Sequence, residues 1–248
     1  MVWDAGCLLG ESPVWCSDTG TLYFVDIKGD ELLRWSGIGS ASRYPLSIQT
    51  GAIALAEVGG LVAAQETGFG WLIVEPWSES SWPLPYPERA GNRFNDGKCD
   101  AAGRFWAASM DDACIAPTGN IWSLSPDGTM RCHGGEFIVG NGFGWSSDNR
   151  LMYFTDSENR HILVYDFDLA NGDIGNPRIF AVVAPECGYP DGLVVDAEDH
   201  VWSAHWDGGR ITRYRPDGSV ERVIKMPVPR PTSLAFGCLL YTSPSPRD

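Results

Sequence analysis

The chain has 248 residues, 44% of them hydrophobic, with 29 Gly, 11 Trp and a formal net charge of −14. That charge argues against nucleic acid or an anionic membrane as a partner. The sequence contains no run as long as a membrane span and no signal peptide at its start. Seven cysteines without a CxxC pair favour free thiols. We therefore expect a cytoplasmic monomer.

One pattern recurs along the chain: a polar residue, a short apolar strand, an acidic turn, and a second strand with an aromatic residue. Its copies begin near residues 11, 51, 95, 141, 191 and 232. Six units of short strands, spaced by roughly 40–50 residues, are typical of propeller blades with about four strands each. The sequence therefore predicts an all-β fold, a six-bladed β-propeller.

The predicted blades follow one another in chain order. Blades one to five are expected at residues 13–35, 51–74, 95–124, 141–165 and 191–214. Prolines exclude residues 75–89 from a central strand and make them a loop. Blade six begins at residue 232 and breaks off after one strand. Residues 238–248 resemble the translation of a sequencing-library adapter. We therefore expect one domain over residues 1–237, with a truncated sixth blade, and a non-native tail.

The register of the repeats predicts where their leading polar residues lie. Glu11, Asn95, Asn141 and Asp191 hold equivalent positions in four blades. Equivalent positions on the innermost strands of a propeller surround one central channel. The four side chains are therefore expected to converge, although Asp-Gly and Asn-Gly are also strong hairpin-turn signals. The register that three of them share with Glu11 favours a site over separate turns.

Four motifs carry a family resemblance. They are LGESPVW from Leu9, RFNDGKCDAAGRFWAASM from Arg93, NGFGWSSD from Asn141 and PDGLVVDAEDHVW from Pro190. With these motifs the chain resembles the senescence-marker-protein/gluconolactonase/luciferin-regenerating-enzyme-like (regucalcin-like) family of six-bladed propellers, and among its members the bacterial sugar lactonases.

The resemblance implies a site. It places one divalent metal ion on Glu11, Asn141 and Asp191, and substrate contacts on Arg93 and Asn95, with Asp96 beside them. Oxygen ligands suit Ca²⁺, Mg²⁺ or Mn²⁺, with Zn²⁺ and Fe²⁺ as further candidates. Some family members carry a Glu just after the methionine of the motif that begins at Arg93. Here that acid is absent or replaced by Asp112, which leaves the sugar specificity open.

Three functions remain open at this point. The first is a gluconolactonase-like carboxylic-ester hydrolase whose partner is a small sugar lactone. Its metal would polarise the carbonyl, and Asp191 would be the general base that helps open the ring to the aldonic acid. The second is a hydrolase of organophosphates or other esters. The third is a non-catalytic calcium-binding propeller. The Arg93 and Asn95 pair favours an enzyme, because a scaffold needs no polar substrate clamp beside its metal.

Overall fold

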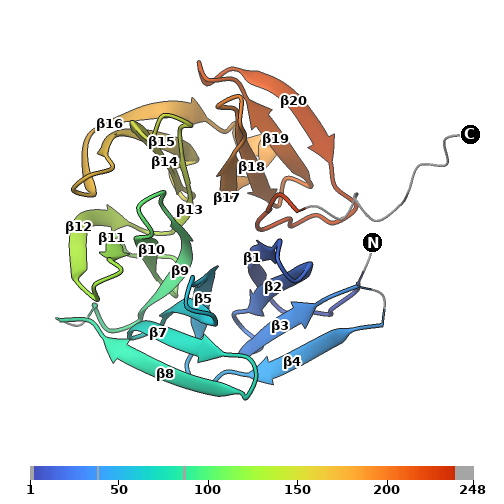
Figure 1. Ribbon diagram of the computed structural model, residues 1–248. Coiled ribbons are helices and arrows are strands. Elements are labelled where there is room, and N and C mark those ends of the chain that lie inside the picture. Colours follow the sequence, from blue (N-terminus) through green and yellow to red (C-terminus); the bar gives the residue numbers. More distant parts are fainter. Residues whose placement is uncertain (1–2, 38, 86–87, 238–248) are drawn as a thin grey trace, which may run out of the picture.

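The computed structural model describes residues 3–37, 39–85 and 88–237. In these ranges the chain forms five antiparallel four-stranded sheets around one centre (Figure 1). We call the sheets blades one to five in chain order. The only helix in the described ranges, η1 (Pro185–Cys187), is too short to cross a bilayer. The six described cysteines are all free thiols.

Within each blade the strands lie side by side in chain order, and the first strand is the innermost. Blades one and two consist of β1 (Gly10–Cys16), β2 (Thr21–Asp26), β3 (Glu31–Trp35), β4 (Ala41–Pro45), β5 (Thr50–Leu55), β6 (Leu61–Gln65), β7 (Gly68–Ile73) and β8 (Ser78–Pro83). Blades three and four consist of β9 (Asn92–Cys99), β10 (Phe105–Asp111), β11 (Gly119–Leu124), β12 (Met130–Phe137), β13 (Gly140–Trp145), β14 (Leu151–Asp156), β15 (His161–Asp168) and β16 (Asp173–Val182). Blade five consists of β17 (Tyr189–Val195), β18 (Val201–Trp206), β19 (Arg210–Tyr214) and β20 (Val220–Lys225).

The prediction of six blades is wrong, because the described residues form five four-stranded sheets. The copy of the pattern that begins near residue 232 contains no strand within the described part of the chain. Instead, the Gly192 amide donates to the Thr232 carbonyl, and the Thr232 hydroxyl donates to the Gly10 carbonyl. This segment therefore joins the innermost strands of blades five and one as a connection. The expected tail over residues 238–248 lies outside the described residues.

The hydrophobic core lies between consecutive blades. It has four clusters, one at each junction from blades one and two to blades four and five. Between blades three and four, Trp106 and Phe143 are fully buried, and Phe143 packs at 5.1 Å from the Phe154 ring. Alternation along each strand supplies these faces, since successive side chains point to opposite sides of a sheet. Packing of this kind fixes the blades around the centre.

At two places, neighbouring innermost strands approach so closely that the residue at the contact cannot have a Cβ atom and must be glycine. A Cβ atom at Gly142 of β13 would lie 2.4 Å from the Leu193 nitrogen of β17. At Gly51 of β5 it would lie 2.3 Å from the Phe94 carbonyl oxygen of β9. Both contacts are to backbone, which cannot rotate away. The central ring is therefore held at a spacing that only glycine permits at these two positions.

We predict that Gly142→Ala lowers the free energy of unfolding by about 1–3 kcal/mol, because overpacking must push β13 and β17 apart. Gly175→Ala in β16 of the same blade is the matched control. A Cβ atom there meets no heavy atom within 4 Å, so its effect should stay within about 0.5 kcal/mol. Urea denaturation of both variants tests this. Equal stability of the two variants would contradict the close approach.

Candidate functional site

Each innermost strand carries a break in its pairing at the same place. In β1 the pairing with β2 becomes irregular directly after Glu11. In β9 the pairing with β10 leaves out Asn95. In β13 and β17 the pairing with the second strand of the blade leaves out Asn141 and Asp191 respectively. In β5 the skipped residue is Gly51, which has no side chain. Such β-bulges re-aim side chains and are frequent beside active sites. The four polar residues singled out by the repeat register thus share one structural position.

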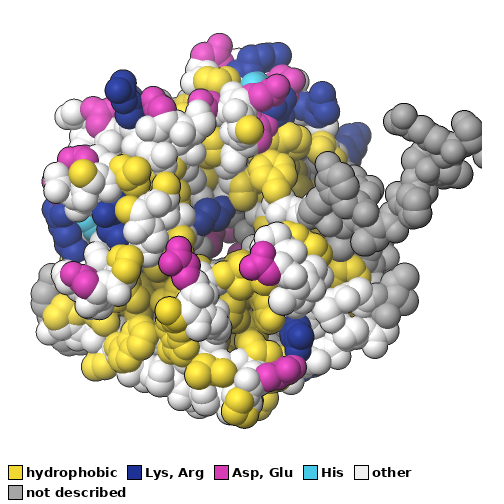
Figure 2. Space-filling view, in the orientation of Figure 1, with side chains coloured by type: hydrophobic (Ala, Val, Ile, Leu, Met, Phe, Trp, Pro, Cys, Tyr) yellow, Lys and Arg dark blue, Asp and Glu magenta, His cyan; other side chains and the backbone are white. Residues whose placement is uncertain are grey.

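All six residues assigned to metal or substrate are buried, at 4–6% exposure. Four blades contribute them: Glu11 from β1, Arg93, Asn95 and Asp96 from β9, Asn141 from β13 and Asp191 from β17. Innermost strands that are neighbours in the chain contact one another from β1 to β17. Figure 2 shows a hollow at the centre of this face, with basic and acidic side chains inside and around it. A small polar molecule could enter there.

Arg93 is the centre of a hydrogen-bonded group on one wall. Its Nη1 donates to Asn95 Oδ1 at 2.8 Å, and its Nε donates to Asp112 Oδ1 at 2.5 Å. Asn95 Nδ2 donates to the Gly140 carbonyl of blade four at 3.1 Å. Lys28, from the turn between β2 and β3, donates to the same Asp112 carboxylate at 2.7 Å. Asp112 therefore bridges the side chains of Lys28 and Arg93, and Arg93 is held in one orientation.

Asn141 and Asp191 each have a buried oxygen without a hydrogen-bond partner among the described residues, namely Oδ1 in both. Asn141 Nδ2 is occupied, because it donates to the Ser157 hydroxyl at 3.2 Å. Buried polar atoms are nearly always paired, so orphaned acceptors need an explanation. A cation bound between the two strands would supply the missing partner for both oxygens.

Negative charge accumulates among these strands. Burial raises the pKa of Glu11 well above its usual range, and the charges of Asp191 and Asp96 raise it further. Burial likewise raises the pKa of Asp191, with Asp96 adding to the effect. The pKa of Asp96 is also raised by burial, and the nearby Lys98 ammonium opposes that rise. Three buried carboxylates thus lie near two positively charged side chains, Arg93 and Lys98. Arg93 is also hydrogen-bonded to Asp112.

The donor set fits a hard divalent cation. Glu11, Asn141 and Asp191 offer carboxylate and amide oxygens, the ligands that Ca²⁺, Mg²⁺ and Mn²⁺ prefer. The two orphaned oxygens belong to two of these three residues. With few protein ligands, such a site keeps positions for water and substrate. The arrangement suits a cation that is both held by the protein and open to a ligand in the channel.

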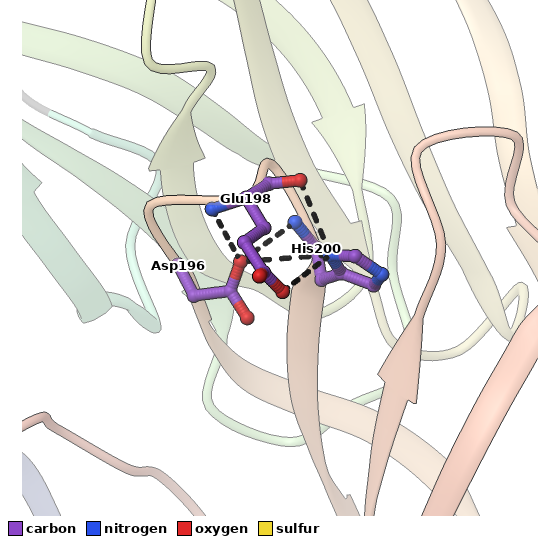
Figure 3. A group of neighbouring side chains, drawn as sticks. All are labelled: Asp196, Glu198 and His200. Carbon is purple, nitrogen blue, oxygen red and sulfur yellow. Dashed lines mark hydrogen bonds and ion pairs between the residues drawn. The ribbon is translucent and has the colours of Figure 1, made fainter.

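A second acidic group lies in the turn between β17's end and β18, where Asp196, Glu198 and His200 have potential ligand atoms within 4.8 Å of one another (Figure 3). Both of its carboxylates already pair with Arg213. Arg213 donates to Asp196 Oδ2 at 2.6 Å and to Glu198 Oε2 at 2.7 Å. Asp196 Oδ1 accepts the backbone amides of Glu198 and His200, and Oδ2 accepts the Trp202 indole. Every Asp196 oxygen is therefore paired.

Blade three has an equivalent turn, in which Asp100 takes the place of Asp196 but no counterparts of Glu198 and His200 are present. Asp100 Oδ1 accepts the backbone amides of Ala102 and Arg104, and its Oδ2 accepts Arg104 Nε and Trp106 Nε1. The acid thus pins the turn between the first two strands of a blade to an arginine and the tryptophan of the second strand. We read Asp196 as the same structural turn in blade five.

Two side chains at the site, Lys28 and Ser157, are not singled out by any motif or by the repeat register. Both lie in hairpin turns, between β2 and β3 and between β14 and β15 respectively. A lysine or serine in a turn is ordinary, so the only available signal was that these turns follow the second strand of a repeat.

Comparison with known proteins gives one family. Residues 9–241 match the model of the SMP-30/Gluconolactonase/LRE-like region. Regucalcin from Oryctolagus cuniculus is 35% identical over 239 residues, covering 93% of this chain and 80% of that protein. Regucalcin from Homo sapiens is 35% identical over 247 residues, covering 95% and 81%.

Solved structures agree with that result. A luciferin-regenerating enzyme superposes with a TM-score of 0.85 at 29% identity, covering 93% of this chain and 80% of that one. A gluconolactonase from Xanthomonas campestris superposes with a TM-score of 0.78 at 21% identity, with the same coverage. At 21% identity the likeness shows the fold alone.

We predict that Asp196→Asn lowers stability and leaves divalent-cation affinity unchanged. Burial alone would raise the pKa of Asp196, but hydrogen bonds from Trp202, Arg213 and backbone amides lower it to about 2. A folded-state pKa below the unfolded value of about 4 contributes about 2 kcal/mol above pH 4, which is lost as the pH falls toward 2.

Denaturation at pH 7 and at pH 3 should therefore show a gap between wild type and Asp196→Asn that shrinks at the lower pH. Isothermal titration with Ca²⁺ or Mn²⁺ measures the affinity. Loss of cation binding in Asp196→Asn would show that the turn, and not the channel, is the metal site.

Proposed function

The chain belongs to the SMP-30/gluconolactonase/LRE-like family, and from this premise we propose that it is a hydrolase that opens a sugar lactone with one divalent cation. The family resemblance predicted from the four motifs is confirmed. One observation carries the proposal beyond the family: two buried acceptor oxygens, from blades four and five, lack partners among the described residues, and they lie close to an arginine that Asp112 and Asn95 hold in one orientation.

Glu11, Asn141 and Asp191 would hold the cation. When bound, it would supply a Lewis acid that polarises the lactone carbonyl and stabilises the charge that develops on its oxygen. Of the three residues, two are carboxylates, so their charge would balance that of the ion. All three residues are buried, so the cation would lie below the surface of the protein.

Asp191 is proposed as the general base. A water molecule attacks the carbonyl carbon of the lactone, and Asp191 takes the proton that this water loses. The bond between the carbonyl carbon and the ring oxygen then breaks, the ring oxygen receives a proton, and an open-chain hydroxy acid remains. Asp191 Oδ1 has no partner among the described residues; with that oxygen on the cation, the other oxygen of the carboxylate would accept the proton.

Arg93, Asn95 and Asp96 are proposed to position the substrate. The bonds of Arg93 run through Nε and Nη1, and Nη2 makes no hydrogen bond to the described residues. That nitrogen can donate to a substrate hydroxyl or carbonyl oxygen. Asn95 has a second Nδ2 proton besides the one donated to Gly140. Asp96 Oδ1 accepts the Gly97 amide, which leaves Oδ2 for a hydroxyl. A rigid donor aimed at the channel favours an enzyme over a calcium scaffold.

We predict that Asp191→Asn reduces lactone hydrolysis by at least ~10²-fold, the usual low end for losing a general base. Cation affinity should also weaken, because one of two anionic ligands is replaced by a neutral amide of the same size. Initial rates on a panel of five- and six-membered aldonolactones measure the first effect. Isothermal titration with Ca²⁺, Mg²⁺, Mn²⁺, Zn²⁺ or Fe²⁺ measures the second.

The metal-stripped wild type is the control for this experiment. Full activity in Asp191→Asn would remove Asp191 from both roles. Absence of hydrolysis of every lactone by wild-type protein, with each cation added back at saturation, would overturn the lactonase proposal. An organophosphate or simple ester hydrolysed instead would identify the other hydrolase class, and cation binding without any turnover would identify a binding protein.

Arg93→Ala should separate substrate positioning from metal binding. We expect kcat/KM to fall by roughly 10²-fold, since misplacing a substrate by about 1 Å can cost that much. Cation affinity should persist, because Arg93 offers no ligand. Arg131→Ala is the control, since Arg131 is about half exposed and pairs with Asp173. A loss of cation binding in Arg93→Ala that matches its loss of activity would refute the positioning role.

A further inference from the structure

Ser157 joins the two blades that carry the orphaned oxygens. It lies in the turn between β14 and β15 of blade four and is 6% exposed. Its hydroxyl donates to the carbonyl of Pro190 at 2.7 Å, in β17 of blade five. It also contacts Asn141 Nδ2 at 3.2 Å, in β13 of its own blade. One small side chain thus touches Asn141 and the residue just before Asp191.

The single proton of the hydroxyl decides how Asn141 is oriented. The Pro190 carbonyl can only accept a hydrogen bond, so it takes the one proton that Ser157 has to give. Toward Asn141 the serine oxygen can therefore act only as an acceptor. Only the amide nitrogen of Asn141 donates, so the NH₂ group must face Ser157. The amide oxygen then points away from Ser157, and it has no partner among the described residues.

Building on the function proposed above, we infer that Ser157 is a positioning residue for the cation site. It turns Asn141 so that an oxygen, rather than an NH₂ group, faces the cation. It also ties the Pro190 carbonyl to blade four, which holds Asp191 at a set distance from Asn141. Outer partners of this kind orient metal ligands, and their loss typically weakens metal affinity by 10–100-fold.

The hydroxyl is not needed for the turn itself. The backbone of Ser157 makes separate hydrogen bonds, with its amide donating to the Val139 carbonyl and its carbonyl accepting the Arg160 amide. Removing the hydroxyl should therefore leave the hairpin in place. It should release the Pro190 carbonyl and remove one of the two contacts that orient the Asn141 amide, the other being a hydrogen bond to Asp191.

The matched pair of variants is Ser157→Ala and Ser203→Ala. Ser203 is buried as well, but its hydroxyl donates to the Ala204 carbonyl and makes no hydrogen bond to a proposed ligand. Titration calorimetry with Mn²⁺ and with Ca²⁺ should give a dissociation constant that is 10–100-fold higher in Ser157→Ala. Ser203→Ala should bind within twofold of wild type. Ser157→Cys, whose somewhat larger thiol fills the site but forms only weak hydrogen bonds, is the second variant should Ser157→Ala unfold.

A measurement on the metal-free protein tests the orientation directly. The side-chain NH₂ signals of Asn141, assigned by their absence in Asn141→Asp, should show one proton slowed in exchange in wild type and not in Ser157→Ala. Equal exchange and equal metal affinity in wild type and Ser157→Ala would overturn the inference. A wild type that bound no divalent ion would refute the proposed function instead, and the exchange measurement would still decide the role of Ser157.

Discussion

A β-bulge at the same place in all five innermost strands underlies the site. A regular antiparallel strand sends successive side chains to opposite faces of its sheet, where they pack against neighbouring blades. An extra residue interrupts that alternation and turns a polar side chain toward the channel. Since the blades repeat around one centre, side chains that are far apart in the chain meet. In β5 the residue at this position is Gly51, which has no side chain, and the backbone of β9 packs directly against it.

Burying several carboxylates close together costs free energy unless positive charge is bound beside them. Burial raises the pKa of Glu11 and of Asp191, and the charge of Asp96 raises both further. The turn at Asp196 behaves in the opposite way, because Arg213 and the backbone lower its pKa. These two acidic groups therefore differ in their hydrogen bonding. Both oxygens of Asp196 have hydrogen-bond partners, whereas Asn141 and Asp191 each have an oxygen without a partner among the described residues, as expected of a site for a cation.

Much of the fold and of the candidate site could be predicted from the sequence, because turn residues and apolar alternation are local signals that recur in every blade. They indicate the three inner strands of five blades and the shared register of the polar residues, but not the outermost strands: β8, for example, lies within residues 75–89, which were expected to be a loop. The same local signals appear after residue 231, yet residues 232–237 form no strand, and Thr232 bonds to Gly192 and Gly10 instead. A local pattern cannot tell a strand from a connection, since strands need partners. Ser157 was missed for a related reason: its contacts depend on how two neighbouring blades are placed.

Anomalous diffraction from crystals of the wild-type protein grown with Mn²⁺ would locate the cation directly. We expect one strong peak in the central channel, at about 2.0–2.6 Å from side-chain oxygens of Glu11, Asn141 and Asp191. The turn at Asp196, Glu198 and His200 should show no peak. A peak at that turn with none in the channel would contradict the assignment of the site to the innermost strands.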